Sequence, residues 1–206
     1  IKPIECPGGC LGCYEREIRE GDGAPVFDLE KVLASLERNM AQDPGRVWNP
    51  PCLHGGEPLA LADEAIDAVL SAVHGKYGRS SIQTSGALMK PDHIEMFRRY
   101  RTFVGISIDG DRAETNLGRW NAPGFNAGEM TARTISIFPL LKSAGVVTSL
   151  IVVLRKYNAG TPELRKDLIR FAMRMRDEFG ITAIRFNPLV GFDQRAILEE
   201  ELSPEA

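Results

Sequence analysis

The stretch Cys6-Pro7-Gly8-Gly9-Cys10-Leu11-Gly12-Cys13-Tyr14 places three thiols within eight residues near the start of the chain. Its Pro-Gly-Gly insert cannot hold a regular helix, so the backbone is free to wrap around a compact object. Thiolates at such close spacing are typical ligands of a metal centre. We therefore interpret the stretch as a loop that holds a metal cluster.

Two other interpretations of the cysteines fit less well. Three clustered cysteines, with Cys52 as the one other cysteine, make a poor disulfide framework for a chain of this length. A tetrahedral zinc site needs a second pair of ligands, which His54, His74 and His93 do not supply. A cubane iron–sulfur cluster on three thiolates keeps one iron uncovered, which suits catalysis better than electron storage.

Length and composition indicate one domain without a broad nucleic-acid surface. The chain has 206 residues, of which 43% are hydrophobic, so it can bury one sizeable core. Its net charge of −3 gives no indication of nucleic acid as a partner. We see no membrane-spanning run and no signal-peptide pattern, and low cysteine usage fits a reducing compartment. We expect a soluble, cytoplasmic protein.

The chain alternates β-rich runs with amphipathic helical runs, which predicts a parallel α/β fold. The predicted strands are residues 1–5, 47–53, 81–84, 103–108, 146–154 and 181–189. The predicted helices run from Asp28 to a stop at Pro44-Gly45, over 63–74, from Pro91 to Tyr100, over 128–144 and from Thr161 to Phe179. Six such units indicate a partial (β/α)6, TIM-like barrel, in which chemistry gathers on the loops that follow the strands.

Polar motifs follow three of these strands. Gly55-Gly56-Glu57-Pro58 combines glycines, which let a backbone approach a ligand closely, with a turn. Gln83-Thr84-Ser85-Gly86 ends an apolar strand, although Ser-Gly is also an ordinary turn signal. Alternation places Ser107 and Asp109 on one face of a strand, which favours a ligand-facing Ser107, whereas we interpret Asp109 as a turn residue before Gly110.

The C-x3-C-x2-C spacing, together with these motifs in this order, resembles the radical S-adenosylmethionine (SAM) superfamily. The likeness is strongest to the core domain of its anaerobic sulfatase-maturating and peptide-modifying (SPASM-type) branch. It implies a [4Fe-4S] cluster on Cys6, Cys10 and Cys13, with SAM bound to the open iron. SAM would be cleaved to a 5′-deoxyadenosyl radical. The same likeness implies a partial barrel, which agrees with the prediction from the alternating elements.

The resemblance also implies which residues contact SAM. A GGEP motif meets the methionine amino group of SAM, and the serine of ISxDG binds the methionine end. A loop arginine pairs with the carboxylate, and an apolar strand touches the adenine. Ser85 stands where this branch has Asn, and Arg112 is the alternative to Arg119. The matching positions are Gly12, Tyr14, Gly55, Gly56, Glu57, Ser85, Ser107, Arg119 and Leu150.

Two departures from the pattern concern the cofactor site. Gly12 replaces the aromatic residue that usually precedes the third cysteine, so its carbonyl would meet the adenine while Tyr14 supplies aromatic surface. Relatives carry a His-Asp pair shortly before the loop arginine, and this chain does not. Outside the motifs, we interpret Cys52 as core packing, His54 as the titratable group near the site, and His74 and His93 as surface residues.

The resemblance therefore implies an enzyme that abstracts hydrogen from a peptide or protein, reduced by a donor such as flavodoxin or ferredoxin. We predict a core domain at 1–191 and an acidic tail or linker at 192–206. Three alternatives stay open: a glycyl-radical activase, a small-molecule radical SAM enzyme, and a non-catalytic protein that binds an iron–sulfur cluster and SAM. Substrate identity, reaction outcome, the fate of SAM and an auxiliary-cluster domain outside this chain also stay open.

Overall fold

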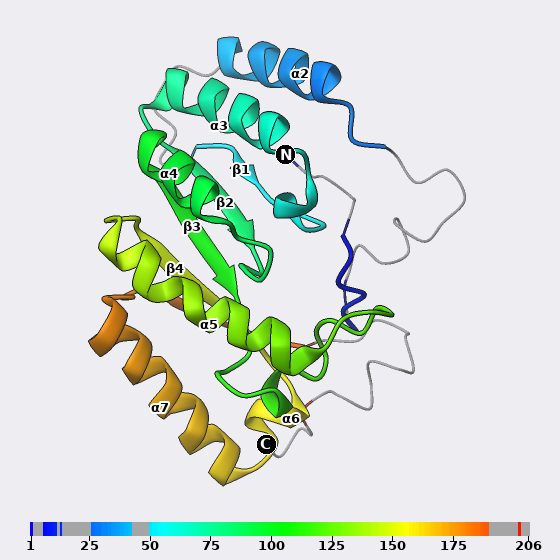
Figure 1. The fold of residues 1–206 in the computed structure, drawn as a ribbon, viewed down its shortest axis with the longest axis vertical. Helices are drawn as coiled ribbons and strands as arrows, with labels where there is room; N and C mark the ends of the chain where they lie inside the picture. The colour runs from blue at the N-terminus through cyan, green and yellow to red at the C-terminus, as the bar shows by residue number, and fades with distance from the viewer. Residues whose placement is uncertain (2–5, 12, 14–25, 43–49, 190–201, 203–206) are drawn as a thin grey trace.

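A parallel sheet is the centre of the fold. The computed structural model describes residues 1, 6–11, 13, 26–42, 50–189 and 202. Within them, five strands lie in the sequence order β1 to β5, and each pairs in parallel with the next. The strands are β1 (Cys52–Leu53), β2 (Ser80–Thr84), β3 (Thr102–Ser107), β4 (Thr148–Leu154) and β5 (Ile184–Pro188). The predicted parallel α/β fold is confirmed (Figure 1).

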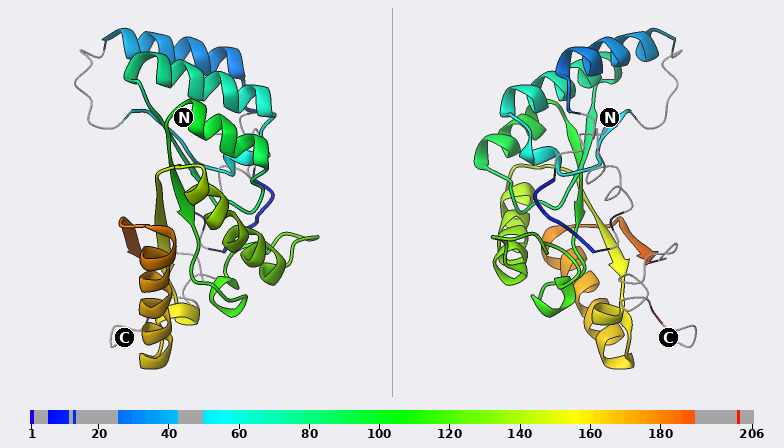
Figure 2. Two further views of the ribbon diagram at one scale, coloured as in Figure 1. Left: turned by 60° about the vertical axis from the view of Figure 1, so that its left-hand side comes forward. Right: turned by 90° about the vertical axis from the view of Figure 1, so that its right-hand side faces the viewer.

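Helices connect these strands and cover one face of the sheet, as the right-hand view of Figure 2 shows for α3, α4 and α5. Asp28, Asn126 and Thr161 cap their helices through side-chain oxygens that accept backbone N–H groups. The helices are α2 (Leu29–Gln42), α3 (Asp63–Tyr77), α4 (Pro91–Arg99), α5 (Ala127–Ser143), α6 (Lys156–Ala159) and α7 (Pro162–Phe179), with 3₁₀ turns η1 (Pro58–Ala60) and η2 (Glu114–Asn116).

The core lies between the sheet and these helices. Every second strand residue points into it, and Val104, Ile106 and Val152 are fully buried there. Phe97 of α4 and Phe138 of α5 pack against them from the helix side. The other face of the sheet corresponds to the inner, concave face of the predicted partial barrel. It carries polar and half-buried residues. That face is the one available for ligands.

The predicted elements agree with the structure to within a few residues. The prediction for α7 from its N-cap Thr161 to Phe179 is confirmed, and Gly145 takes the left-handed conformation expected just beyond α5 (φ 68°). The sequence reading missed α6, η1 and η2. Of the first predicted strand, only Ile1 is described, and its backbone exchanges hydrogen bonds with Cys52 and His54 beside β1.

No helix in the described ranges has both the length and the apolar character needed to cross a bilayer. The predicted division into a core domain and a tail falls largely outside the described residues, because only residue 202 of the tail is among them. The division therefore stays a prediction.

Candidate cofactor site

A cavity of about 400 Å³ lies at the carboxyl ends of the strands. The cysteine loop forms one wall beside the loop that follows β3 (Figure 1). Nine of the predicted site residues line it: Cys6, Cys10, Cys13, Gly55, Gly56, Glu57, Ser85, Ser107 and Arg119. Gly12 and Tyr14 lie outside the described residues. The structure thus brings together residues that are up to 113 positions apart, from Cys6 to Arg119.

Two of the three thiols, those of Cys6 and Cys10, lie beside Gly8. Its N–H points to the sulfur of Cys6 at 3.4 Å, as N–H groups do toward metal-bound thiolates. A Cβ built on Gly8 would stand 3.5 Å from the sulfurs of both Cys6 and Cys10 and 3.5 Å from the indole of Trp120. The glycine therefore keeps open the space beside the sulfurs. Two thiols beside an open space, with Cys13 lining the same cavity, fit an iron–sulfur cluster.

The paired glycines line another part of the cavity. Gly55 and Gly56 both have positive φ (85° and 54°), a conformation that favours glycine. Glu57 is 3% exposed, and its carboxylate accepts bonds from Leu59 N–H (3.2 Å), the Thr84 hydroxyl (2.5 Å) and both the N–H (2.9 Å) and hydroxyl (2.5 Å) of Ser85. The side chain of Glu57 consequently joins η1 to the end of β2. Both glycines line the cavity, and they reach it with backbone atoms because they have no side chain.

Asp109 lies in a bend just beyond β3, as its interpretation as a turn residue predicted, but the sequence did not reveal that its side chain is buried and ion-paired. Its side chain is fully buried, and Oδ1 accepts from Arg119 Nη2 at 2.7 Å and from Val153 N at 2.8 Å. Oδ2 lies 3.3 Å from Nε of Arg155. β3 and β4 separate at this point, so the carboxylate replaces a ladder hydrogen bond.

Arg119 lines the cavity from the loop after β3 and is 9% exposed. Burial alone lowers the pKa of its guanidinium, but the attraction and hydrogen bond of Asp109, and the charges of Cys10 and Glu57, raise the pKa overall. Arg119 is thus a fixed cation beside the thiols. Arg112, the alternative, is paired with Asp167 at 2.7 Å on an exposed surface and does not line this cavity.

The position of Leu150 in β4 does not agree with its predicted contact with the adenine of SAM. Leu150 is 1% exposed, pairs in register with Ile106 and packs in the core beneath the helices. Its neighbours Ile151 and Val153 point the other way and line the cofactor cavity. The strand is apolar on both faces because one face packs in the core and the other lines a cavity. Sequence alone could not tell which face was which.

Arg155 and Trp120 are among the further cavity residues that sequence reasoning missed. Arg155, directly after β4, is 3% exposed, and Trp120 is 6% exposed with a positive φ of 59°. Trp120 also stacks near Phe125, with ring centroids 5.4 Å apart. An arginine at the end of an apolar strand, and a tryptophan next to the predicted loop arginine, were the available signals.

Comparison with known proteins identifies the family. The sequence profile described as the radical SAM superfamily matches residues 4–172. These residues make up most of the chain and include every cysteine and every motif of the cavity. The fold and the site define an iron–sulfur enzyme that uses SAM. The chain belongs to the radical SAM superfamily.

Named relatives share part of the chain. It is 31% identical over 113 residues to a serine-type anaerobic sulfatase-maturating enzyme of Bacteroides thetaiotaomicron, which covers 53% of this chain and 27% of that protein. An uncharacterized protein of Archaeoglobus fulgidus is 36% identical over 119 residues, or 56% of this chain and 26% of that one. The chain therefore spans about a quarter of the length of these two relatives.

Solved structures share the fold. Native anSMEcpe with bound AdoMet and Kp18Cys peptide superposes with a TM-score of 0.77 at 17% identity, covering 99% of this chain and 55% of that one. SuiB of Streptococcus suis bound to S-adenosylmethionine gives 0.71 at 16% identity, covering 98% and 42%. HydG, a maturase of the [FeFe]-hydrogenase, gives 0.68 at 13% identity, covering 99% and 46%. The partial-barrel fold class is confirmed.

The residues of the cavity fit the family's [4Fe-4S] cluster and SAM. Cys6, Cys10 and Cys13 all line the cavity and would supply the three thiolates, and the space kept open by Gly8 lies against two of them. Arg119 and Arg155 present positive charge to a centre whose thiolates are negative and to the carboxylate of SAM. Ile151 and Val153 supply apolar surface of the kind that an adenine needs.

Proposed function

We propose that this radical SAM enzyme abstracts hydrogen from a peptide or protein substrate as the first step of a modification. When bound, the cluster and SAM together supply the electron and the carbon radical for that abstraction. The residues of the chain bind the cofactors, orient them and keep competing reactants out. Flavodoxin or ferredoxin, as electron donor, and a cytoplasmic location are parts of the same proposal.

The cofactor roles are assigned from position in the cavity. Gly55 and Gly56 present backbone groups to the amino end of SAM, while Ser107 and Arg119 meet its carboxylate. Ile151 and Val153, in place of Leu150, contact the adenine. Ser85 acts indirectly, because its hydroxyl donates to Glu57. Gly12 and Tyr14 keep the roles that the family resemblance implies.

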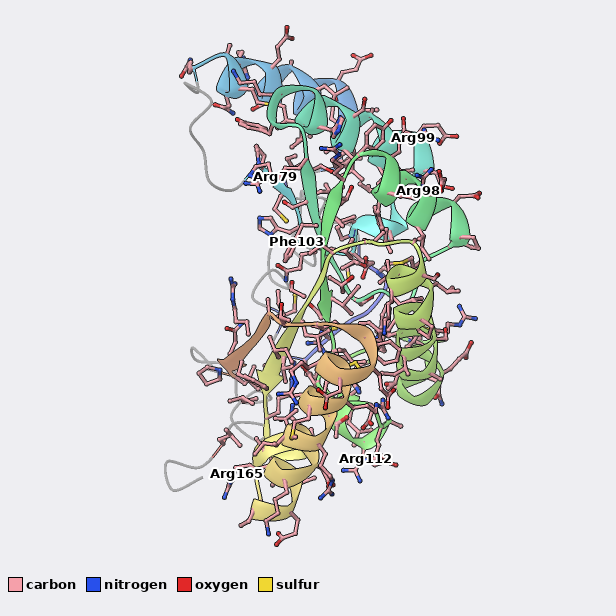
Figure 3. All side chains as sticks on the ribbon, turned by 90° about the vertical axis from the view of Figure 1, so that its left-hand side faces the viewer. Arg79, Arg98, Arg99, Phe103, Arg112 and Arg165 are labelled. Atoms are coloured by element: carbon pink, nitrogen blue, oxygen red, sulfur yellow. The ribbon has the colours of Figure 1, made fainter. Side chains whose placement is uncertain are left out.

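The observation that carries the peptide proposal is a second cavity of about 720 Å³ on the same face of the sheet. Gln83 and Ile151 line both cavities, so the two adjoin. Phe103, which is 41% exposed, lies in its wall on the side of the sheet away from Arg98 and Arg99 of α4 (Figure 3). Arg79 and Arg185 also line it, whereas no Asp or Glu is among its described lining residues.

The side chains in this second cavity are suited to a peptide. Gln83, Gly105 and Ser149 are paired across β2, β3 and β4, and therefore lie side by side on the concave face. An amide, a hydroxyl and an aromatic ring supply hydrogen bonds and apolar contact in one place. The named relatives support the same substrate class, because anSMEcpe was solved with a peptide and SuiB with precursor peptide SuiA.

The test is an anaerobic assay of the reconstituted, reduced protein against a peptide library and a panel of small molecules. We expect selected peptides to raise 5′-deoxyadenosine formation above the substrate-free rate and to change mass. Stimulation by small molecules alone would overturn the peptide proposal. Formation of a glycyl radical on a partner protein would favour an activase instead.

A further inference from the structure

Arg155 touches the cysteine loop directly. It follows the last residue of β4, and its side chain is 4% exposed. Nη1 and Nη2 both donate to the carbonyl oxygen of Leu11, each at 3.1 Å. Leu11 lies between Cys10 and Cys13, so one guanidinium binds the backbone of the loop that carries the thiols.

The backbone of Arg155 is itself held rigidly. Asn158, which is 1% exposed, accepts from Arg155 N at 2.8 Å and donates to the carbonyls of Asp109 and Val153, both at 2.9 Å. The guanidinium is therefore fixed to the ends of β3 and β4. Through its hydrogen bonds to Leu11, the guanidinium can restrain the cysteine loop.

The loop has a second, backbone attachment. Leu11 N donates to Gly118 O at 2.9 Å, and Ala122 N donates to Gly8 O at 3.2 Å. These bonds join the loop to the segment after β3, whereas Arg155 joins it to β4. The two attachments approach Leu11 through different atoms, its N–H and its carbonyl.

The charges around the cavity make Arg155 electrostatically important. Arg119 and Arg155 share the one carboxylate of Asp109, which leaves this buried trio with one net positive charge. Glu57, a further buried carboxylate, lines the same cavity and is engaged by its own hydrogen bonds. Loss of Arg155 would thus remove a positive charge from a site that also holds three thiolates.

We propose that Arg155 is a positioning residue for the cluster, which fixes the cysteine loop to β4 and raises the reduction potential of the cluster by its charge. The proposal rests on the [4Fe-4S] cofactor of the family and is independent of the substrate. Adding an electron makes the cluster more negative, so a nearby buried cation stabilises the reduced form. A guanidinium with two donors on one carbonyl also restrains the loop more than one ammonium does.

The test compares R155Q, R155K and the double variant D109N/R155Q with wild type. After identical anaerobic reconstitution, iron and sulfide per chain report on the loop, and a redox titration followed by electron paramagnetic resonance reports the midpoint potential. R155Q should bind less iron and have a lower potential. R155K should keep the wild-type potential but bind less iron, because it retains the charge and loses the two-donor contact.

The double variant separates charge from contact. D109N/R155Q removes one charge of each sign. Because Arg119 is still present, the trio keeps the net charge that it has in wild type. It should recover the potential lost in R155Q without recovering the iron content. The matched control is R165Q, because Arg165 also donates to a carbonyl, that of Ala159 at 2.9 Å, but lies on α7 (Figure 3). R165Q should match wild type in both measurements.

Two results would overturn the proposal. One is wild-type iron content and potential in R155Q. The other is an equal fall in potential for R155Q, R155K and the double variant, because that would follow from general damage and not from charge. Circular dichroism of each apoprotein identifies a variant that fails to fold, and the folded members of the set then decide the question.

Discussion

At the scale of single residues, Glu57 shows that the side chain of a cofactor-motif residue can be engaged by contacts within the protein. Its carboxylate accepts four hydrogen bonds from three residues, which join η1 to the end of β2. The bonds fix the geometry of Gly55 and Gly56 just before it. Position in the sequence suggested a direct contact with SAM, whereas the structure assigns this carboxylate to the scaffold of the site.

We expect Glu57→Gln to lower the free energy of unfolding by about 2 kcal/mol, because an amide cannot accept all of these bonds and leaves buried donors unpaired. Urea unfolding of the apoprotein followed by circular dichroism measures this. Glu95→Gln is the control, since Glu95 is an exposed carboxylate that pairs with Arg98. Equal stability of the two variants would show that the Glu57 bonds contribute nothing.

Residue types at motif positions could be predicted from the sequence, but partners could not. The cysteines, paired glycines, Ser107 and Arg119 all reach one cavity as expected. The buried role of Asp109 could not be predicted, because its partners, Arg119 and Arg155, lie 10 and 46 positions further along the chain. Leu150 was misplaced because a one-residue shift in an apolar strand exchanges the two faces without changing the pattern.

At the scale of elements, the cysteine loop depends on close backbone approach to the segment after β3. Gly9 has φ 59°, and a Cβ there would stand 2.8 Å from the backbone nitrogen of Ala122. Backbone cannot yield as a flexible side chain can. Gly75 in α3 offers a contrast, because a Cβ there meets nothing within 4 Å.

We therefore expect Gly9→Ala to bind less iron after reconstitution, with a strain of roughly 1–3 kcal/mol that displaces the loop. Gly75→Ala should keep wild-type iron content and stabilise α3 by up to about 1 kcal/mol, since alanine favours a helix interior. Iron and sulfide analysis and urea unfolding measure the two effects. Wild-type iron content in Gly9→Ala would contradict the docking of the loop.

Helices α3 and α4 are joined by a buried histidine, which the sequence reading wrongly placed on the surface. His93 is fully buried, and its Nδ1 accepts from Lys90 N at 3.2 Å. The proton therefore belongs on Nε2, which donates to Asp63 at 2.9 Å. Helical periodicity could not reveal this partner, because Asp63 lies 30 residues away at the start of α3.

This contact predicts a pH dependence of stability. The hydrogen bond from His93, and then that from Lys90, lower the pKa of Asp63 below its usual 3.8. A lowered pKa in the folded state means that the contribution is present above the unfolded value and is lost as the pH falls through the folded value. Below about pH 4, the stability of wild type should thus fall more steeply than that of His93→Phe. Urea unfolding at several pH values measures both slopes, and identical slopes would refute the contact.

At the scale of the whole molecule, the order of strands and helices determines where the chemistry lies. Parallel strands in sequence order place all their carboxyl ends at one edge, where motifs from separate loops meet. This part of the fold was predictable, because alternation and helix caps are local signals. The division of the concave face into two adjoining cavities was not, because it depends on register across three strands.

That register supplies the last prediction, which concerns Gly105 between Gln83 and Ser149. A Cβ at Gly105 would stand 3.6 Å from Ser149 Oγ and 3.8 Å from Gln83 Cγ, which are ordinary contact distances, so a Cβ causes no clash there. Gly105 lines the second cavity and not the cofactor cavity. Gly105→Val should therefore bind wild-type amounts of iron and SAM while its added methyl groups occupy substrate space.

In Gly105→Val, we expect 5′-deoxyadenosine to form at the wild-type rate without substrate, while the rise caused by an active peptide falls about tenfold or more, as for a steric loss of roughly 1.4 kcal/mol. Chromatography of the nucleoside and mass spectrometry of the peptide follow the two products. Gly75→Ala serves as a glycine replacement far from both cavities. Unchanged peptide turnover would place the substrate elsewhere, because a bound peptide could not share the space with the valine.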